Sequence, residues 1–206
     1  MIIKRTANAG ILLNLDTSSI LLDGVCDEHF SYEGTPGFIR DELLKKPPDA
    51  LAFTHNHKDH YDISFLKKCK EVSCCKVLCD FLESITKVGN LKISALPTRH
   101  IGKVSVTHVS YVIEGSKCVW FMGDATPIVL KTMSEYPKPD VIIVPYAYVI
   151  SESAWRYTKE LGAEKIILLH MPKRSKDEYE LWNTMEKITS GDKKLVIPEI
   201  GQTINI

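Results

Sequence analysis

The sequence predicts an α+β fold in which two β-sheets lie together with helices outside both. Short β-rich segments follow one another at the start and in the middle of the chain, which is typical of antiparallel hairpins. Strands and helices alternate in the last third, which favours helices packed on the outer faces of the sheets. No linker, repeat or low-complexity stretch interrupts the pattern, so we expect residues 1–206 to form a single domain.

Apolar runs bounded by turn-forming or charged residues predict the strands. They lie at residues 1–5, 10–16, 19–24, 49–53, 76–79, 91–97, 105–115, 117–124, 140–146, 165–170, 195–199 and 202–206. Segments with apolar residues at helical spacing predict the helices. They lie at residues 38–46, 61–70, 80–88, 127–136, 151–162 and 176–188. Pro47 and Pro48 end the first of these helices, because proline lacks the N–H that a helix interior needs.

Composition argues against two classes of partner. Lys plus Arg equals Asp plus Glu at 26 each, so no overall charge attracts long nucleic acid or an anionic membrane. No run of about 18 apolar residues occurs, and the first residues, MIIKRTANAG, contain no apolar signal region. We therefore expect a cytoplasmic protein that binds neither a membrane nor long nucleic acid, with its six cysteines as free thiols. The oligomeric state stays open.

The segment FTHNHKDHYD, residues 53–62, holds three of the chain's seven histidines. A solvated polar loop is the alternative interpretation, but H-x-H-x-D-H rarely arises by chance. Residues two apart in an extended segment project to the same side, so His55 and His57 can bind one ion. Asp59 and His60 lie where the chain must turn into the next helix, and they would point to a neighbouring site. Neutral imidazole suits zinc and similar metals, and a carboxylate neutralises part of their charge.

Three more potential ligands follow apolar runs later in the chain. The run in ALPTRH ends at His100, WFMGD ends at Asp124, and IILLH ends at His170. Each residue alone could be a buried, hydrogen-bonded polar group. Their occurrence in this order after the histidine motif indicates a metal site built from several strand ends.

The series THNHKDH, His100, GDA with Asp124 and LLH with His170 resembles the metallo-β-lactamase superfamily of metal-dependent hydrolases along nearly the whole chain. The segments ILLDG and LVIPEIGQTINI also resemble its aspartate-bearing strand and its closing strands. The likeness is closest to the small single-domain branch of proteins similar to ascorbate-6-phosphate lactonase. It implies a four-layer αββα sandwich with the metals in a cleft at one edge of the two sheets.

The resemblance also implies two divalent transition-metal ions, with zinc expected and manganese or iron as alternatives. His55, His57 and His100 would bind the first ion, Asp59, His60 and His170 would bind the second, and Asp124 would bridge them. A hydroxide shared by the ions would be the nucleophile, because such ions lower the pKa of water toward about 7. Asp59 would also act as a catalytic residue that orients this nucleophile, and Asp23 would fix a ligand histidine.

The implied function is a metal-dependent hydrolase that cleaves an ester, lactone, thioester or phosphodiester bond in a small metabolite. His57 stands where diiron redox members carry Glu, and Asp124 stands where β-lactam-cleaving members commonly carry Cys, so both activities are disfavoured. The 206 residues leave little room for the extra domain of members that act on long RNA. A non-catalytic metal-binding protein and, less favoured, a diiron redox protein are the alternatives.

Residues near the ligands could bind substrate. Arg99, Lys173 and Arg174 lie close in sequence to His100 or His170 and would bind an anionic substrate, unless they belong to ordinary solvated loops. Both interpretations stay open at this point.

Two further residues are candidates for contacts around the metals. Tyr146 follows a predicted strand and would donate a hydrogen bond to a developing oxyanion, with core packing as the alternative. His108 lies inside a predicted strand, which is a poor position from which to reach an ion at the sheet edge. His100 is therefore the expected ligand, and His108 is expected to orient a ligand or contact substrate.

Overall fold

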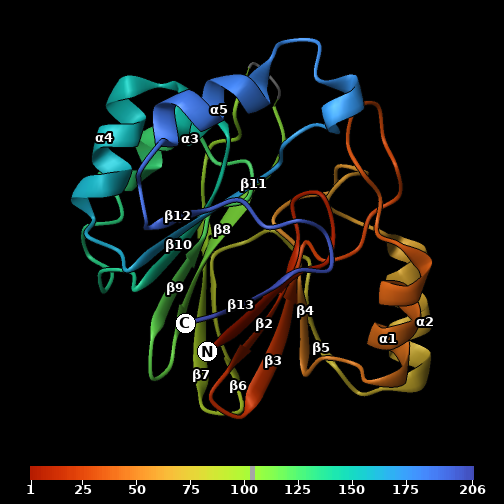
Figure 1. The fold of residues 1–206 in the computed structure, drawn as a ribbon. Helices are drawn as coiled ribbons and strands as arrows, with labels where there is room; N and C mark the ends of the chain where they lie inside the picture. The colour runs from red at the N-terminus through yellow and green to blue at the C-terminus, as the bar shows by residue number, and fades with distance from the viewer. Residues whose placement is uncertain (103–104) are drawn as a thin grey trace.

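Two mixed β-sheets lie at the centre of the protein in the computed structural model, which describes residues 1–102 and 105–206 (Figure 1). The first sheet has the strand order β13-β1-β2-β3-β4-β5, with β1 (Ile2–Arg5), β2 (Ile11–Leu15), β3 (Ser18–Leu22), β4 (Ala50–Ala52), β5 (Lys76–Leu78) and β13 (Thr203–Asn205). The second has the order β12-β11-β10-β9-β8-β7-β6, with β6 (Ser84–Val88), β7 (Leu91–Pro97), β8 (Val109–Glu114), β9 (Cys118–Phe121), β10 (Val141–Pro145), β11 (Lys165–Leu169) and β12 (Leu195–Val196).

Helices cover the outer face of each sheet (Figure 1). The first sheet is covered by α1 (Gly37–Lys45) and α2 (Ile63–Val72), and the second by α3 (Ala147–Ile150), α4 (Glu152–Glu160) and α5 (Leu181–Thr189). Two short 3-10 helices, η1 (Pro127–Lys131) and η2 (Arg174–Lys176), lie in connecting segments. The predicted α+β class and the four-layer αββα sandwich are confirmed. In the part of the chain that the structure describes, every helix is too short or too polar to cross a membrane.

Three apolar clusters hold the layers together. Because side chains alternate between the faces of a strand, one set fills the space between the sheets, where Leu13 and Phe121 belong to the same buried cluster. The opposite set packs against helices. Leu51 of the first sheet shares a cluster with Phe65 of α2, and Trp120 of the second shares one with residues of α4 and α5.

The strand directions bring the polar loops to one edge of the sandwich. In the first sheet β3 and β4 are parallel, and in the second β9, β10 and β11 are parallel. Strand β7 has the direction of β9, since both pair antiparallel with β8. The carboxyl ends of these strands therefore share an edge within each sheet. The segments that follow them carry Asp23, residues 53–62, His100, Asp124 and His170.

Residues 80–88 contain a strand instead of the predicted helix. Strand β6 pairs antiparallel with β7, and Val88 lies opposite Leu91. The β-branched residues in SITKV favour an extended chain, and Gly89–Asn90 form the turn of the hairpin, with Gly89 at a φ of 55°. The helix prediction was wrong because apolar spacing in so short a segment does not separate a helix from a strand.

Several other elements are shorter than predicted. Of the helix expected over 127–136 only η1 forms, and α5 begins at Leu181 instead of residue 176. The Asp177 carboxylate accepts hydrogen bonds from the N–H groups of Leu181 and Trp182 at 2.9 and 2.8 Å, which satisfies the start of the helix at that point. The single turn α3, which follows β10, was not predicted.

Tyr111 links the two sheets beside the histidine motif. It lies in β8 of the second sheet and is 1% exposed, and its hydroxyl donates to the Phe53 carbonyl, which follows β4 of the first sheet, at 2.7 Å. The hydroxyl also lies 3.4 Å from the Leu78 carbonyl. This hydrogen bond crosses the apolar space between the sheets, where a carbonyl without a partner is costly.

We expect Tyr111→Phe to lower the free energy of unfolding by about 1–3 kcal/mol, because it leaves the buried Phe53 carbonyl without its donor. Denaturant unfolding would measure the change. Tyr179→Phe is the matched control, since Tyr179 is 83% exposed, and it should change stability by less than about 0.5 kcal/mol. Equal stability of Tyr111→Phe and the native protein would contradict the expected role of the hydroxyl.

Candidate metal centre

The histidine motif of residues 53–62 continues β4 in an extended conformation and then turns into α2. The His60 N–H donates to the His57 carbonyl at 3.0 Å, and the Asp62 side chain caps the start of α2. The turn folds the motif onto itself, so the ring centroids of His55 and His60 are only 4.2 Å apart. A local backbone turn, together with a helix cap, thus gathers side chains that an extended chain would spread.

The described residues form three groups of three potential ligands, of which one, Asp23, His55 and His60, overlaps the two others. His55, His57 and His100 form the first group, and Asp59, His60 and His170 form the second. Within each group the candidate ligand atoms lie within 4.8 Å of one another. Five of the six side chains are buried, and His57 is half-buried. The structure therefore brings together all six of these predicted residues, in the two sets expected from the sequence.

Asp124 lies between the two groups. Its Oδ2 is 3.6 Å from His100 Nε2 of the first group and 3.4 Å from both His60 Nε2 and His170 Nε2 of the second. The preceding Gly123 has a φ of 54°, and a Cβ at that position would come within 2.6 Å of the Thr54 side chain. Glycine is needed there to pass Thr54 and place Asp124 at the junction of the groups.

Asp23 orients one histidine of each group. Its carboxylate accepts hydrogen bonds from the Thr54 N–H at 2.7 Å, the Thr54 hydroxyl at 2.6 Å and His60 Nδ1 at 2.8 Å. Since the Thr54 hydroxyl donates its hydrogen bond to Asp23, its oxygen accepts a hydrogen bond from His55 Nδ1, which lies 2.9 Å away. Both rings then direct Nε2 into the centre, where it can bind a metal ion in place of a proton.

The donor set fits bound metal ions. Four buried atoms of this donor set have no hydrogen-bond partner among the described residues: Nε2 of His55, His60 and His100, and Oδ1 of Asp124. His100 Nδ1 donates to the Ile101 carbonyl at 2.6 Å, so its Nε2 is also free to coordinate. Leaving buried polar atoms unpaired is costly, and borderline transition metals bind this mixture of imidazole and carboxylate.

Carboxylates make the centre favourable for a cation. Burial opposes charge on His60, but Asp124 and Asp23 raise its pKa well above the ordinary value. Burial also opposes ionisation of Asp59, yet its hydrogen bond from His170 and the nearby His60 lower its pKa to about 2. His55, in contrast, has a lowered pKa because of burial and the neighbouring His60, so it stays neutral. Ionised carboxylates and a neutral imidazole are the protonation states that bind metal.

His108 uses both ring nitrogens within the protein. Its Nε2 accepts from the Asp124 N–H at 3.0 Å, and its Nδ1 lies 2.7 Å from the Thr98 hydroxyl. The Thr98 hydroxyl continues to Ser110, which donates to the Met122 carbonyl at 3.0 Å. Burial lowers the pKa of His108 to about 3, so the ring is neutral and can accept from Asp124. His108 precedes β8 instead of lying inside it, and it positions the backbone of Asp124.

The basic residues expected around the cleft differ in their surroundings. Lys173 pairs with Glu28 at 2.6 Å. Arg174 pairs with Glu186 at 3.3 Å, and its guanidinium lies 3.9 Å from the centre of the Trp182 ring. Arg99 is exposed. Lys173 and Arg174 are thus held by local partners instead of pointing freely at the metal centre.

Tyr32 is a site residue that the sequence did not indicate. Its ring packs edge-on against His170, with centroids 4.4 Å apart, and the predicted Tyr146 lies next to the same histidine at 6.4 Å. Burial, followed by the neighbouring Tyr146 and Asp124, raises the pKa of Tyr32 above its ordinary value. Both tyrosines therefore lie beside the second ligand group, and Tyr32 keeps its proton.

Fold and ligand geometry together define a protein of the metallo-β-lactamase class. Residues 9–170 match the family model of the beta-lactamase superfamily domain, and the chain belongs to this family. The search of curated protein sequences gave no match.

Solved structures share the fold over the full length of the chain. A possible metal-dependent hydrolase from Veillonella parvula DSM 2008 has a TM-score of 0.75 at 16% identity, covering 100% of this chain and 99% of that one. Igni18, a metallo hydrolase from Ignicoccus hospitalis KIN4/I, has a TM-score of 0.72 at 18% identity, covering 98% and 97%. An isothiocyanate hydrolase from Delia radicum gut bacteria has a TM-score of 0.68 at 17% identity, covering 100% and 99%.

We expect His100→Ala to lose metal at a concentration that saturates the native protein, because it removes a ligand of the first group. His108→Ala should keep more metal, since it removes hydrogen bonds to the Asp124 backbone and to Thr98 but no ligand of either group. Metal analysis of both variants, at equal folding by circular dichroism, would measure the difference. His29→Ala, outside both groups, is the control. Loss of metal from His108→Ala together with full retention by His100→Ala would overturn this assignment.

Proposed function

We propose that the protein is a dinuclear metal-dependent hydrolase that cleaves an ester, lactone, thioester or phosphodiester bond in a small molecule. The observation that carries the proposal is the position of Asp124 Oδ2, which lies within 3.6 Å of Nε2 atoms from both ligand groups. A carboxylate between two complete groups of three ligands suits two neighbouring ions better than one tetrahedral ion.

Each part of the site has a role in this proposal. The six side chains of the two groups and Asp124 hold the ions, with zinc expected and manganese or iron as alternatives. When bound, two such ions would lower the pKa of a water molecule and polarise the oxygen of the scissile bond. Asp59, which is ionised at neutral pH because its pKa is about 2, accepts a hydrogen bond from the attacking water and orients it. Tyr32 or Tyr146 donates to the oxygen on which negative charge develops.

The similar structures support hydrolysis of a small molecule. One of them is an isothiocyanate hydrolase, and it covers 100% of this chain and 99% of its own length without an added domain. Another is a metallo hydrolase with 97% of its own length covered.

The metal-loaded protein should contain two transition-metal ions per chain and hydrolyse at least one member of a panel of lactones, thioesters and phosphodiesters. Elemental analysis and initial rates would test this, with a chelator expected to remove the activity and added metal to restore it. Two bound ions without any turnover would favour the non-catalytic metal-binding alternative. Visible absorption that changes on reduction would favour the diiron redox alternative instead.

Asp124→Asn should lower the metal content from two ions to one or none and reduce kcat by about 100-fold or more. The reason is that two dications about 3.5–4 Å apart lose the negative charge between them. Metal analysis and kinetics would be compared with the exposed control Asp41→Asn, which lies on α1 and should behave as the native protein. An Asp124→Asn protein with native metal content and rate would refute the bridging role.

A further inference from the structure

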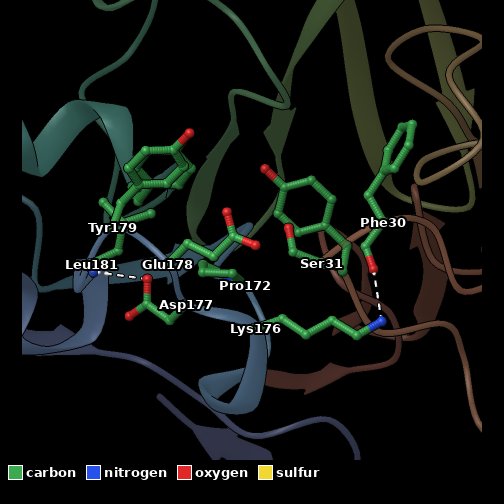
Figure 2. Close-up of a pocket in the computed structure, with 10 residues that line it drawn as sticks. Phe30, Ser31, Pro172, Lys176, Asp177, Glu178, Tyr179 and Leu181 are labelled. Atoms are coloured by element: carbon green, nitrogen blue, oxygen red, sulfur yellow. Dashed lines mark hydrogen bonds between the residues drawn. The ribbon is translucent and has the colours of Figure 1, made fainter.

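A cavity of about 440 Å³ lies beside the metal centre. Two segments form its walls: one is residues 30–32, and the other contains Pro172 and residues 176–181 (Figure 2). We call it the tyrosine pocket, since Tyr32, Tyr146 and Tyr179 all line it. The segments are joined by backbone, because the Lys173 N–H donates to the Ser31 carbonyl at 2.8 Å.

The tyrosine pocket adjoins the second ligand group through two tyrosines. Tyr32 and Tyr146 line the pocket and also flank the His170 ring, at centroid distances of 4.4 and 6.4 Å. A substrate whose reacting bond lies at His170 would therefore place its adjoining group against these two rings. The pocket has the size of a group of several carbon atoms.

Two exposed aromatic rings lie at the rim, and one of them, Phe30, is held at a cost to the fold. Phe30 is 80% exposed and has a φ of 48°, a left-handed conformation that bulky residues rarely adopt. It is placed at the tip of a tight turn, where His29 and Tyr32 exchange backbone hydrogen bonds at 2.8 and 3.3 Å. Tyr179 is 83% exposed on the opposite wall (Figure 2). Neither ring contributes to the core, so their placement indicates contact with a ligand.

The charges of the pocket do not favour an anion. Lys176 is held by the Phe30 carbonyl at 3.1 Å and by Glu28 at 3.4 Å. The Asp177 carboxylate is used as the cap of α5. Glu178 lines the pocket and forms no ion pair with any residue that the structure describes. Glu28 also pairs with Lys173, and the charged residues that line the pocket, Lys176, Asp177 and Glu178, carry a net charge of −1 among aromatic rings.

We propose that the tyrosine pocket binds a flat, apolar group of the substrate, such as an aryl ring, and disfavours a group with a negative charge. This substrate class rests on the proposed hydrolase function and differs from the anionic substrate that Arg99, Lys173 and Arg174 suggested from the sequence. Offset or edge-on packing of an aryl group on Tyr32, Tyr146 and the rim rings supplies the selectivity.

Three thioesters with the same ethanethiol leaving group would test the proposal: those of hydrocinnamic, hexanoic and glutaric acid. Hydrocinnamoyl thioester should have the highest kcat/KM and the anionic glutaryl thioester the lowest. Phe30→Ala and Tyr179→Ala should each lower kcat/KM for the hydrocinnamoyl thioester by about 3- to 10-fold. Phe38→Ala is the control, because Phe38 is 65% exposed on α1 and does not line the pocket. Glu178→Lys should raise kcat/KM for the glutaryl thioester several-fold, whereas Glu71→Lys on α2 should not.

Binding of hydrocinnamyl alcohol, which cannot be hydrolysed, separates this proposal from the proposed function. Calorimetric titration should give a Kd that rises about 3- to 10-fold in Phe30→Ala and Tyr179→Ala and stays unchanged in Phe38→Ala. Binding with this pattern, but without turnover of any lactone, thioester or phosphodiester of the panel, would refute the hydrolase and leave the pocket assignment intact. Turnover without an aryl preference, together with native rates in Phe30→Ala and Tyr179→Ala, would overturn the pocket and leave the hydrolase intact.

Discussion

The buried carboxylate of Asp23 is the interaction on which the metal centre depends. It is 0% exposed, and burial raises its pKa, while hydrogen bonds from His60 and Thr54 act in the opposite direction. Those bonds supply the partners without which a buried carboxylate would be strongly destabilising. The Thr54 hydroxyl, which is oriented by Asp23, also forms a hydrogen bond with His55. One carboxylate at the end of β3 therefore sets the rotation of a ring in each ligand group. The distance of 3.4 Å between Asp124 Oδ2 and His60 Nε2 requires the His60 ring in this position.

Much of the architecture could be predicted, because apolar runs ending in polar residues mark buried strands whose ends meet at a sheet edge. In β9 and β11 this pattern places Asp124 and His170 directly at the cleft. The prediction failed where spacing carries little information. Residues 80–88 suit a helix or a strand by periodicity, and pairing with β7 decided the outcome. The start of α5 was also set by a single cap, Asp177, within a segment of helical composition.

The candidate ligands could be proposed from sequence since a dense local motif and three strand ends carry them, and the resemblance to the metallo-β-lactamase superfamily divided them into two groups. The supporting contacts could not, because they join segments far apart in the chain through common residue types. Nothing in GVCDEHFSYEG distinguishes Tyr32 from other loop tyrosines, yet its ring packs on His170. In the same way, a lysine after a ligand histidine suggests an anion site, whereas Lys173 is committed to Glu28. Contacts of this kind depend on how distant segments pack together, and the residues next to each partner in the sequence do not reveal them.

Backbone strain connects the metal centre with the tyrosine pocket. Asp23 and His170 have φ values of 46° and 62°, and Phe30 and Glu180 have 48° and 52°. A left-handed conformation costs a non-glycine residue about 1–2 kcal/mol, and it persists where surrounding contacts over-determine it. The Asp23 N–H donates to Ala52 and the His170 N–H to Asn8, so both are fixed at the ends of their strands. There the unusual φ turns a side chain from the direction of its strand into the cleft. At the tyrosine pocket the same left-handed conformation exposes the Phe30 ring to solvent, and packing in the apolar core does not explain this position. Phe30 lines the tyrosine pocket, and His170 contacts Tyr32, which also lines it, so a ligand that reaches from the second ligand group to the rim would lie against both strained positions.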